Sequence, residues 1–481
     1  MEKYMCEDVV KNKLLEHFRN MIVKKDPSRS KAYEAIGVTS FLRDWLTKKY
    51  ADSDGNCKFQ QIAQLVKTYL PQPTQWQALK ARLVDGEPVR LLAKITVDID
   101  IATGERSFGL SHYGLSSKDT LIADDVWEQN RESFVRTTEV WGQIELRYCK
   151  LDDDEGKIVL TKYSDFCPYT LDVDVYKEKR RAFTVEEWID VVLGAVDYNP
   201  AGYKTFKARM GMCKRLLPFI EKNVNLIELA PKSTGKSYLY GQVSKNVWAV
   251  STGTVSRAQL FYNVAKKRYG LVACHDCVIL DEVNKMTFPN PSELQGALQG
   301  YLENRSVRID AIQFTSDSGF VISGNIPCDS MDIESNMMKY LPSVFNESAL
   351  IDRFHGFIEG WDLPRLLEEQ KASSWNLNTE YFTSIMHLMR SDGSYRRIVD
   401  DLIEVGKDAD IRHLEAVKRL TTGFLKLLFP HVQSVDDVDR DEFKKYCLDP
   451  AIHMRTIIWK QLCFMDREYR KTSMPELHVK E

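Results

Sequence analysis

One segment of the sequence has the residue types and the spacing of a loop that binds phosphate. Residues 230–237 read Ala-Pro-Lys-Ser-Thr-Gly-Lys-Ser and stand between a short apolar segment, 226–229, and a plausible helix. This is the context of a Walker A loop, in which backbone amides surround the phosphates. Lys236 would reach the β- and γ-phosphate oxygens, and the Ser237 hydroxyl would ligate Mg²⁺. We therefore expect ATP and Mg²⁺ as ligands, held by Ala230, Pro231, Lys232, Ser233, Thr234, Gly235, Lys236 and Ser237.

One position departs from the motif. Ala230 stands where the motif has its first glycine. The loop must therefore turn there without a positive φ angle, or the match is accidental. Taken alone, Gly-Lys-Ser fits an ordinary loop that enters a helix equally well.

A second segment supplies the carboxylates that such a loop needs. About forty residues on, the apolar run 277–280 ends in Asp281 and Glu282, which is the arrangement of a Walker B segment. Asp281 would hold Mg²⁺ through its water shell, and Glu282 would act as the general base on the attacking water. The alternative is a solvated strand end, but the upstream loop favours the catalytic interpretation.

Two further residues follow apolar segments in the same region. Asn325 comes after the predicted strand 319–323 and is similar to a sensor 1 residue beside the γ-phosphate, although a turn amide that caps the strand is the alternative. Arg353 lies next to Asp352 and could form a surface ion pair with it. It instead resembles the arginine finger that many ring ATPases extend into a neighbour's site. These motifs indicate a catalytic site at a subunit seam.

The elements that must position these residues fall into four predicted segments. Helical spacing predicts a helical N-terminal domain over 1–75, and period-two alternation, as in 93–101, predicts a β-rich module over 76–178. A small barrel of OB-like type is one candidate for that module, and the acidic run 152–155 reads as a hairpin tip. A capping box at Thr184 opens an α/β core with a largely parallel sheet over 183–365, and a helical lid and C-terminal region follows over 366–481.

Composition restricts the class of protein. The chain has 481 residues, 43% of them apolar, and a net charge of −3, so it is neither disordered nor a globally basic nucleic-acid coat. No apolar run approaches the ~20 residues that cross a bilayer, and the charged start argues against a signal peptide. We expect a cytoplasmic protein that does not contact a membrane. Among ten cysteines, only Cys274 and Cys277 form a C-x-x-C pair, which we interpret as buried strand cysteines rather than metal ligands.

With these motifs in place, the chain resembles the BrxL family of BREX phage-resistance proteins, which is described as Lon-related and built on an MCM-like AAA+ core. The resemblance covers roughly residues 180–430. It rests on segments 181–190, 228–237, 258–263, 269–272, 281–283, 324–326, 352–355, 360–361 and 422–430. The implied fold is an AAA+ P-loop ATPase core with helical and β-rich N-terminal modules and a helical C-terminal lid.

The resemblance also implies a function and partners. It implies a DNA-binding homo-oligomer, a hexamer or stacked hexamers, that acts in bacterial antiviral defence with other defence-system proteins as candidate partners. Arg412 resembles the sensor 2 arginine of MCM helicases. For DNA, the family would use the β-rich module over 76–178 and a hairpin ahead of sensor 1, around 300–319, which would place Arg305 and Arg308 near DNA. Exposed arginines are the alternative for all three. Longer members of the family append a Lon-like domain with a Ser/Lys dyad. The part of this chain after residue 430 is too short for such a domain, so no peptidase activity is expected of it.

Two other functions remain open at this stage. One is an AAA+ protein remodeller or unfoldase whose pore grips polypeptide. The other is a non-catalytic, ATP-dependent DNA-binding ring in which Ala230 marks a slow site. DNA-stimulated hydrolysis, peptide-stimulated hydrolysis, and tight ATP binding without turnover would separate the three.

Overall fold

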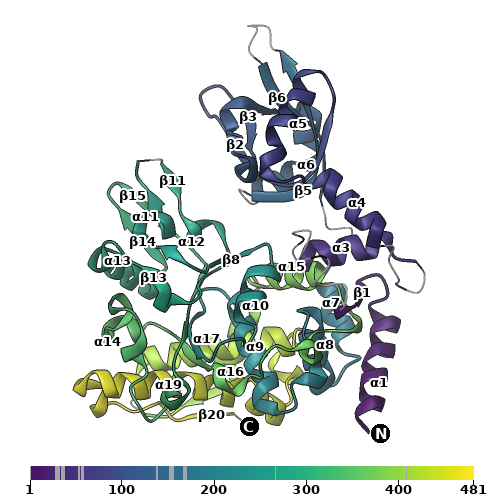
Figure 1. Ribbon diagram of the computed structural model, residues 1–481. Helices are drawn as coiled ribbons and strands as arrows, with labels where there is room; N and C mark the ends of the chain where they lie inside the picture. Colours follow the sequence, from purple (N-terminus) through teal and green to yellow (C-terminus); the bar gives the residue numbers. More distant parts are fainter. Residues whose placement is uncertain are drawn as a thin grey trace. The chain divides into compact units, whose positions relative to one another are not determined.

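Two units of the chain each form their own core in the computed structural model (Figure 1). The larger unit comprises residues 1–27 and 171–481, and the smaller comprises residues 28–170. The predicted helical segment 1–75 is thus divided between the two units. The structure describes residues 2–27, 33, 38, 40–52, 55, 59–136, 139–150, 156–165, 171–265, 267–407 and 409–480.

The larger unit is organised around a parallel sheet of five short strands. They are β7 (Asn225–Ala230), β8 (Val247–Val250), β12 (Cys277–Leu280), β16 (Gly319–Asn325) and β17 (Gly356–Glu359). Their order across the sheet is β17-β7-β16-β12-β8, and every pairing is parallel. All residues of β7, β12 and β17 are buried, as expected for parallel strands covered on both faces. The prediction of an α/β segment with a largely parallel sheet is confirmed.

Helices before and between these strands cover the sheet. The capping box at Thr184 is confirmed, because its side chain accepts from the Glu187 amide and Glu187 accepts from the Thr184 amide. The helices of this part are α7 (Val173–Arg180), α8 (Val185–Ala195), α9 (Phe206–Ile220), α10 (Lys236–Gln242), α11 (Arg257–Leu260), α12 (Leu271–Cys274), α13 (Pro291–Asn304) and α14 (Ser348–Ile351).

Small two-stranded sheets project from the strand connections. Strands β14 (Ser306–Ile309) and β15 (Ile312–Thr315) form an antiparallel hairpin ahead of β16, where the sequence predicts one. A second antiparallel pair joins β10 (Tyr262–Asn263) to β11 (Arg268–Tyr269), and the rings of Tyr269 and Phe314 lie 5.1 Å apart between the two hairpins. Strand β9 (Gly253–Thr254) runs parallel to β13 (Met286–Thr287).

The C-terminal part of the larger unit is mainly helical, as predicted. Its helices are α15 (Thr379–Met389), α16 (Ser394–Leu402), α17 (Ile411–Leu428), α18 (Arg440–Phe443) and α19 (Asp449–Met465), with a short sheet of β19 (Ile403–Val405) and β20 (Leu477–Val479). The N-terminus joins this unit through α1 (Glu2–His17) and through β1 (Ile22–Lys25), which pairs with β18 (Ser374–Leu377).

The smaller unit contains a five-stranded sheet with its own apolar core. The strands are β2 (Val89–Ile99), β3 (Arg106–Gly109), β4 (Thr120–Ile122), β5 (Glu139–Lys150) and β6 (Gly156–Asp165), in the order β3-β2-β5-β6-β4. Helices α3 (Ser40–Tyr50), α4 (Phe59–Tyr69), α5 (Trp76–Val84) and α6 (Asp124–Arg136) complete it. The expected β-rich module is therefore present, while the predicted acidic hairpin tip at 152–155 lies outside the described residues.

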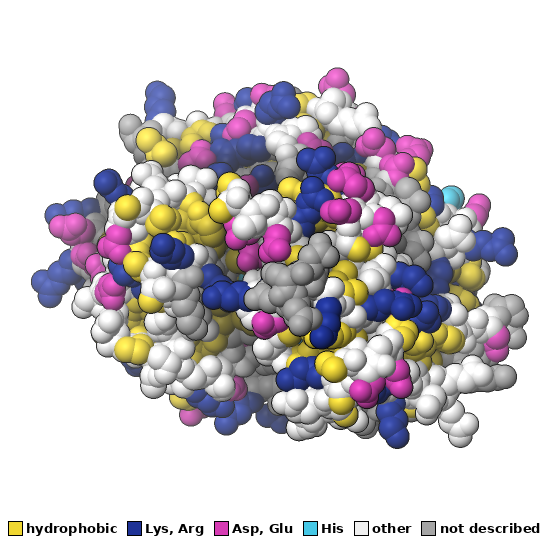
Figure 2. Space-filling model, turned by 90° about the horizontal axis from the view of Figure 1, so that it is seen from above, with side chains coloured by type: hydrophobic (Ala, Val, Ile, Leu, Met, Phe, Trp, Pro, Cys, Tyr) yellow, Lys and Arg dark blue, Asp and Glu magenta, His cyan; other side chains and the backbone are white. Residues whose placement is uncertain are grey.

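Surface charge is mixed on the face that Figure 2 presents. Lys and Arg side chains alternate there with Asp and Glu, and apolar side chains lie between them, in keeping with a net charge of −3. Within the described part of the chain, no helix has the length and apolar character needed to span a membrane.

Candidate functional site

The segment 231–235 forms a loop between the end of β7 and the start of α10. Ser233 and Gly235 both have left-handed backbones, with φ angles of 69° and 79°. Alternation of left- and right-handed residues turns successive amides toward one side of a loop, which is how backbone nests receive anions. The hydroxyl of Tyr198 donates to the carbonyl of Gly235 at 2.9 Å and fixes the end of the loop. This geometry suits a loop that binds phosphate.

Ala230, the departure from the motif, causes no backbone strain. It is the last residue of β7, where it is fully buried and pairs with Asn325, and it is not among the residues with positive φ. Room for its methyl group comes from Gly360, where an added Cβ would lie 2.2 Å from the Ala230 Cβ. The loop therefore begins its turn after position 230, and alanine is accommodated by a glycine on the neighbouring chain segment.

A buried ion pair between α9 and β7 supports the loop through a hydrogen bond to its backbone. Arg215 of α9 and Glu228 of β7 are both fully buried and lie 2.5 Å apart. Arg215 also donates to the carbonyl of Thr234 at 2.9 Å, and Tyr240 donates to Glu228 at 3.1 Å. Burial alone would lower the pKa of Arg215, but Glu228 outweighs it and raises the pKa, so the guanidinium stays charged. This pair is not predicted from the sequence, although a glutamate inside an apolar strand is a usable signal for a buried partner.

The polar residues predicted at the strand ends lie together. Lys236 donates to Asn325 Oδ1 at 2.9 Å, and Asn325 Nδ2 donates to Glu282 Oε1 at 3.2 Å. The Ser237 hydroxyl donates to Asp281 Oδ2 at 2.5 Å. Burial is the largest influence on Lys236 and lowers its pKa. One polar cluster thus joins the loop to the carboxyl ends of β12 and β16.

Glu282 differs from its neighbours in backbone and exposure. Its φ angle is 54°, a left-handed value that is uncommon for a residue other than glycine. Its side chain is 30% exposed and accepts from Lys285 at 2.7 Å in addition to Asn325. Strained backbone of this kind concentrates at functional sites, where the surrounding structure holds it in place. Glu282 therefore has the position, access and fixed orientation that a general base needs.

The donors at this site fit Mg²⁺. The Ser237 hydroxyl and the Asp281 carboxylate are hard oxygen donors in direct contact, and Asp281 is fully buried. Mg²⁺ takes one or two such protein oxygens and completes its shell with water and phosphate. A group of three or more His, Cys, Asp or Glu side chains suited to a metal does not occur among the described residues. The site therefore suits Mg²⁺ that arrives with a nucleotide better than a metal held by protein alone.

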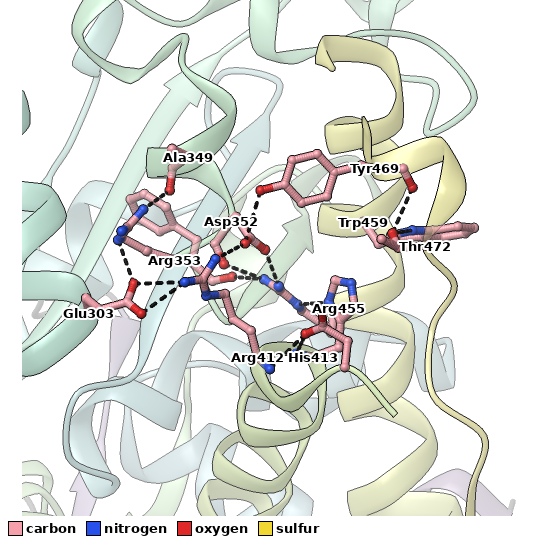
Figure 3. Close-up of polar contacts among 12 residues, drawn as sticks. Glu303, Ala349, Asp352, Arg353, Arg412, His413, Arg455, Trp459, Tyr469 and Thr472 are labelled. Carbon is pink, nitrogen blue, oxygen red and sulfur yellow. Dashed lines mark hydrogen bonds and ion pairs between the residues drawn. The ribbon is translucent and has the colours of Figure 1, made fainter. Parts of the chain in front are cut away.

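Arg353 and Arg412 belong to a second cluster, which Figure 3 shows. Arg353 Nε lies 2.8 Å from Glu303, and Arg353 also donates to the carbonyl of Ala349. Arg412 lies 3.0 Å from Glu303 and 2.5 Å from Asp352. The two arginines therefore share Glu303, and they are paired with carboxylates of the same chain.

This second cluster borders a cavity of about 670 Å³. Its lining residues come from the end of α13, from 352–355 and from the start of α17, and they include Arg353, Arg412 and Arg419. Arg305, predicted to contact DNA, also lines this cavity, whereas Arg308 is exposed on the β14–β15 hairpin opposite Gln313. The two arginines predicted to act together therefore face different surroundings.

The two cysteines of the C-x-x-C pair also lie in different surroundings. Cys277 is buried in β12, as predicted, but Cys274 is exposed at the end of α12, so the expectation of two buried strand cysteines is wrong for Cys274. The separation arises because the chain passes from a short helix into a strand between the two residues.

Two family models match the sequence. The model described as the ATPase domain of Lon-like protease BrxL-like proteins matches residues 158–475. The model of the BREX system Lon protease-like protein BrxL N-terminal region matches residues 16–148. Together these matches cover both units.

Two curated relatives resemble the chain over most of its length. Lon-like protease BrxL of Escherichia coli O9:H4 (strain HS) is 28% identical over 463 residues, which are 93% of this chain and 64% of the relative. Lon-like protease BrxL of Bacillus cereus (strain H3081.97) is 26% identical over 456 residues, which are 91% of this chain and 64% of the relative. The chain thus spans about 64% of the length of each.

Proposed function

The chain belongs to the BrxL family, and from that premise we propose that it is a ring-forming AAA+ ATPase that binds DNA and couples ATP hydrolysis to DNA binding or translocation in BREX antiphage defence. One observation carries the proposal. Five side chains meet in one hydrogen-bonded cluster: Lys236 and Ser237 at the start of α10, Asp281 and Glu282 directly after β12, and Asn325 at the end of β16.

The chemistry follows from the position of each side chain. Lys236 would bind the β- and γ-phosphate oxygens, and Mg²⁺ at Ser237 and Asp281 would neutralise charge on them. Glu282 would accept a proton from water as the water oxygen bonds to the γ-phosphorus. The bond between that phosphorus and the oxygen bridging to the β-phosphate breaks, and ADP leaves with the electron pair of the broken bond. Asn325, which already contacts Glu282 and Lys236, would orient the water.

We propose a ring because the two arginines that would stabilise the transferring phosphoryl group lie outside this cluster. Transfer of a phosphoryl group is accelerated by an arginine on the developing charge. Arg353 and Arg412 line a separate cavity and are paired with Glu303 and Asp352 rather than with the loop. We propose that they serve the nucleotide of a neighbouring subunit, Arg353 as the finger and Arg412 as sensor 2, in a hexamer or stacked hexamers.

The two hairpins ahead of β12 and β16 support the DNA part of the proposal. Arg308 and Arg268 are exposed on them, and Tyr269, 56% exposed, packs edge-on against Phe314. Exposed cations next to exposed aromatic rings are suited to phosphates and bases of nucleic acid. We propose that these hairpins contact DNA.

The test is the ATPase rate with and without DNA, single- and double-stranded, at two salt concentrations. We expect DNA to raise the rate several-fold at low salt and less at high salt, because phosphate contacts release counterions. Stimulation by unfolded polypeptide instead of DNA would support a protein remodeller. Tight ATP binding with negligible turnover under every condition would support a non-catalytic DNA-binding ring.

A further inference from the structure

Two carboxylates hold Arg353 and Arg412, and they differ in how firmly they are themselves held (Figure 3). Asp352 accepts from Arg412 at 2.5 Å and from Arg455 at 2.6 Å, and the Tyr469 hydroxyl donates to it at 3.2 Å. Its side chain is 5% exposed and that of Arg455 is fully buried. Asp352 is therefore part of the core.

The pKa of Asp352 agrees with this fixed role. Burial alone would raise the pKa, but the charges of Arg455 and Arg412 outweigh burial and leave it below the ordinary value of an aspartate. Arg455 is fixed in turn, because it donates to the carbonyls of Asp352 and Phe354 and to His413 Nδ1. The carboxylate of Asp352 thus remains charged and stationary, and it anchors Arg412 from one side.

Glu303 holds Arg412 from the other side and also pairs with Arg353, but it has much less support itself. It lies in the last turn of α13, and its side chain is 34% exposed. Its carboxylate oxygens lie 2.8 Å from Arg353 Nε and 3.0 Å and 3.3 Å from Arg412 Nη2. A long side chain at a helix end can rotate into solvent, so this carboxylate can leave without disturbing the core.

We propose that Glu303 is a displaceable counter-ion, which occupies the anion position between Arg353 and Arg412 until a phosphate of a second copy's nucleotide takes it. This inference rests on the proposed function, because it requires the two arginines to act across a ring seam. Guanidinium groups bind carboxylate and phosphate with the same fork of N–H donors, so one can replace the other. The adjoining cavity, whose wall also carries Arg305 and Arg419, gives the phosphate a path.

The two arginines can bind the neighbouring subunit's phosphate only after Glu303 has left. While Glu303 is in place, the arginines are neutralised, and an incoming phosphate must first break its bonds to both. Free phosphate in solution gains too little to displace it, whereas a triphosphate held by another subunit's loop arrives at high effective concentration. Glu303 therefore raises the subunit concentration at which the ring becomes active, and it leaves the active ring's rate unchanged.

The test is the ATPase rate of Glu303→Gln as a function of protein concentration at saturating ATP. The substitution keeps the side-chain length and removes the charge, so we expect the half-maximal concentration to fall by about tenfold, the effect of losing one moderate charged interaction. Glu293→Gln is the matched control, since Glu293 lies on the same helix and pairs with Arg257 at 3.0 Å. It should leave the half-maximal concentration unchanged.

A second measurement separates this role from a structural one. Because an Arg353→Ala, Arg412→Ala variant hydrolyses ATP too slowly for a rate midpoint, the concentration midpoint of ATP-dependent assembly is measured by sedimentation. Glu303→Gln should lower this assembly midpoint in the wild-type background and leave it unchanged in the double variant, because the charges it competes for are gone. A Glu303→Gln variant with the wild-type midpoint, or with a lower rate at saturating protein, would overturn the inference. If instead the wild-type rate per subunit stays constant down to concentrations at which the protein sediments as single chains, the seam itself is wrong and the proposed function fails first.

Discussion

The side chain of Glu282 is held by two partners of different kinds, Asn325 and Lys285. Asn325 also contacts Lys236, so the proposed base, the proposed sensor and the proposed phosphate-binding lysine move as one group. The side chain of Asp281 accepts from the Ser237 hydroxyl and from the backbone amide of Glu282, and it contacts none of the three side chains of that group. A change at Glu282 should therefore affect hydrolysis and leave the Mg²⁺ donors intact.

Glu282→Gln tests this separation directly. The amide keeps the size of the side chain and its contact with Asn325 but cannot accept a proton from water. We expect ATP affinity and assembly close to wild type, with turnover reduced by 10²–10⁴-fold, the typical size of a general-base effect. Equilibrium ATP binding and steady-state phosphate release measure the two quantities. Wild-type turnover would exclude Glu282 from the reaction.

Lys236→Ala should fail one step earlier. Lys236 is nearly buried at the start of α10, and its removal takes away the charge that would face the phosphates. We expect ATP affinity to fall by at least tenfold. Lys204→Ala is the matched control, because Lys204 is an exposed lysine of the same unit that lies outside the loop. Equal affinity in the two variants would argue against 230–237 as a phosphate-binding loop.

At the level of elements, much of the site was predictable because parallel strands present their carboxyl ends at one edge. Once 226–229, 277–280 and 319–323 are recognised as buried strands, the polar residues that follow them must lie near one another. The position of Arg353 beside Arg412 could not be predicted from local sequence patterns. Their shared carboxylate, Glu303, lies 50 residues before one and 109 before the other, and no local pattern connects the three.

The contact between β7 and the segment after β17 explains Ala230 and can be tested. Gly360→Ala would place a Cβ 2.2 Å from the Ala230 Cβ and 2.9 Å from the Leu229 carbonyl oxygen, so the start of the loop must move. We expect a loss of about 1–3 kcal/mol in the free energy of unfolding, as for other overpacked sites, and weaker ATP binding. Thermal unfolding and ATP titration measure both effects.

Ala230→Gly provides the comparison for that variant. Because Ala230 does not need positive φ, the single substitution should leave turnover within a few-fold of wild type. In the Gly360→Ala background it should recover part of the stability, since the closest clash is removed while the Leu229 oxygen remains. If the double variant is no better than Gly360→Ala alone, the two positions do not compensate each other.

At the scale of the whole molecule, we expect a pH dependence of stability from three histidines of the larger unit, of which His413 is buried and His355 and His431 are half-buried. Burial lowers the pKa of His413 and of His431 to about 4 each, and nearby arginines act in the same direction; burial and arginines also lower the pKa of His355. These rings are neutral in the folded chain, whereas the unfolded chain protonates them below pH ~6.5. The unfolded state then binds more protons, so stability falls as pH decreases from about 6.5 toward 4.

The measurement is the urea midpoint between pH 7.5 and 5. We expect it to be constant above about pH 7 and to fall below about 6.5. Carboxylates with lowered pKa, such as Asp352 and Glu359, lose their contribution only as pH falls below about 4.5, so they do not account for a change in this window. A midpoint independent of pH from 7.5 to 5 would contradict neutral buried histidines.

The ring itself is tested by mixing two inactive variants. Arg353→Ala should bind ATP but turn over slowly, because arginine fingers contribute on the order of 10³–10⁵ in rate. Lys236→Ala should bind ATP at least tenfold more weakly, yet it retains Arg353. In a mixed ring, some seams combine an intact loop from one subunit with an intact Arg353 from the other, and those seams should hydrolyse ATP.

Recovery of activity on mixing is therefore specific to action across subunits. If Arg353 served the loop of its own chain, neither variant would contain a complete site in any mixture, and the mixture would be as inactive as its parts. Exchange of subunits must be established first with labelled chains, and Glu282→Gln mixed with Lys236→Ala is a control. That pair has an intact Arg353 in every subunit but no subunit with both an intact loop and an intact base, so it should stay inactive. Activity in the control, or none in the Arg353→Ala mixture despite exchange, would refute the trans assignment of Arg353.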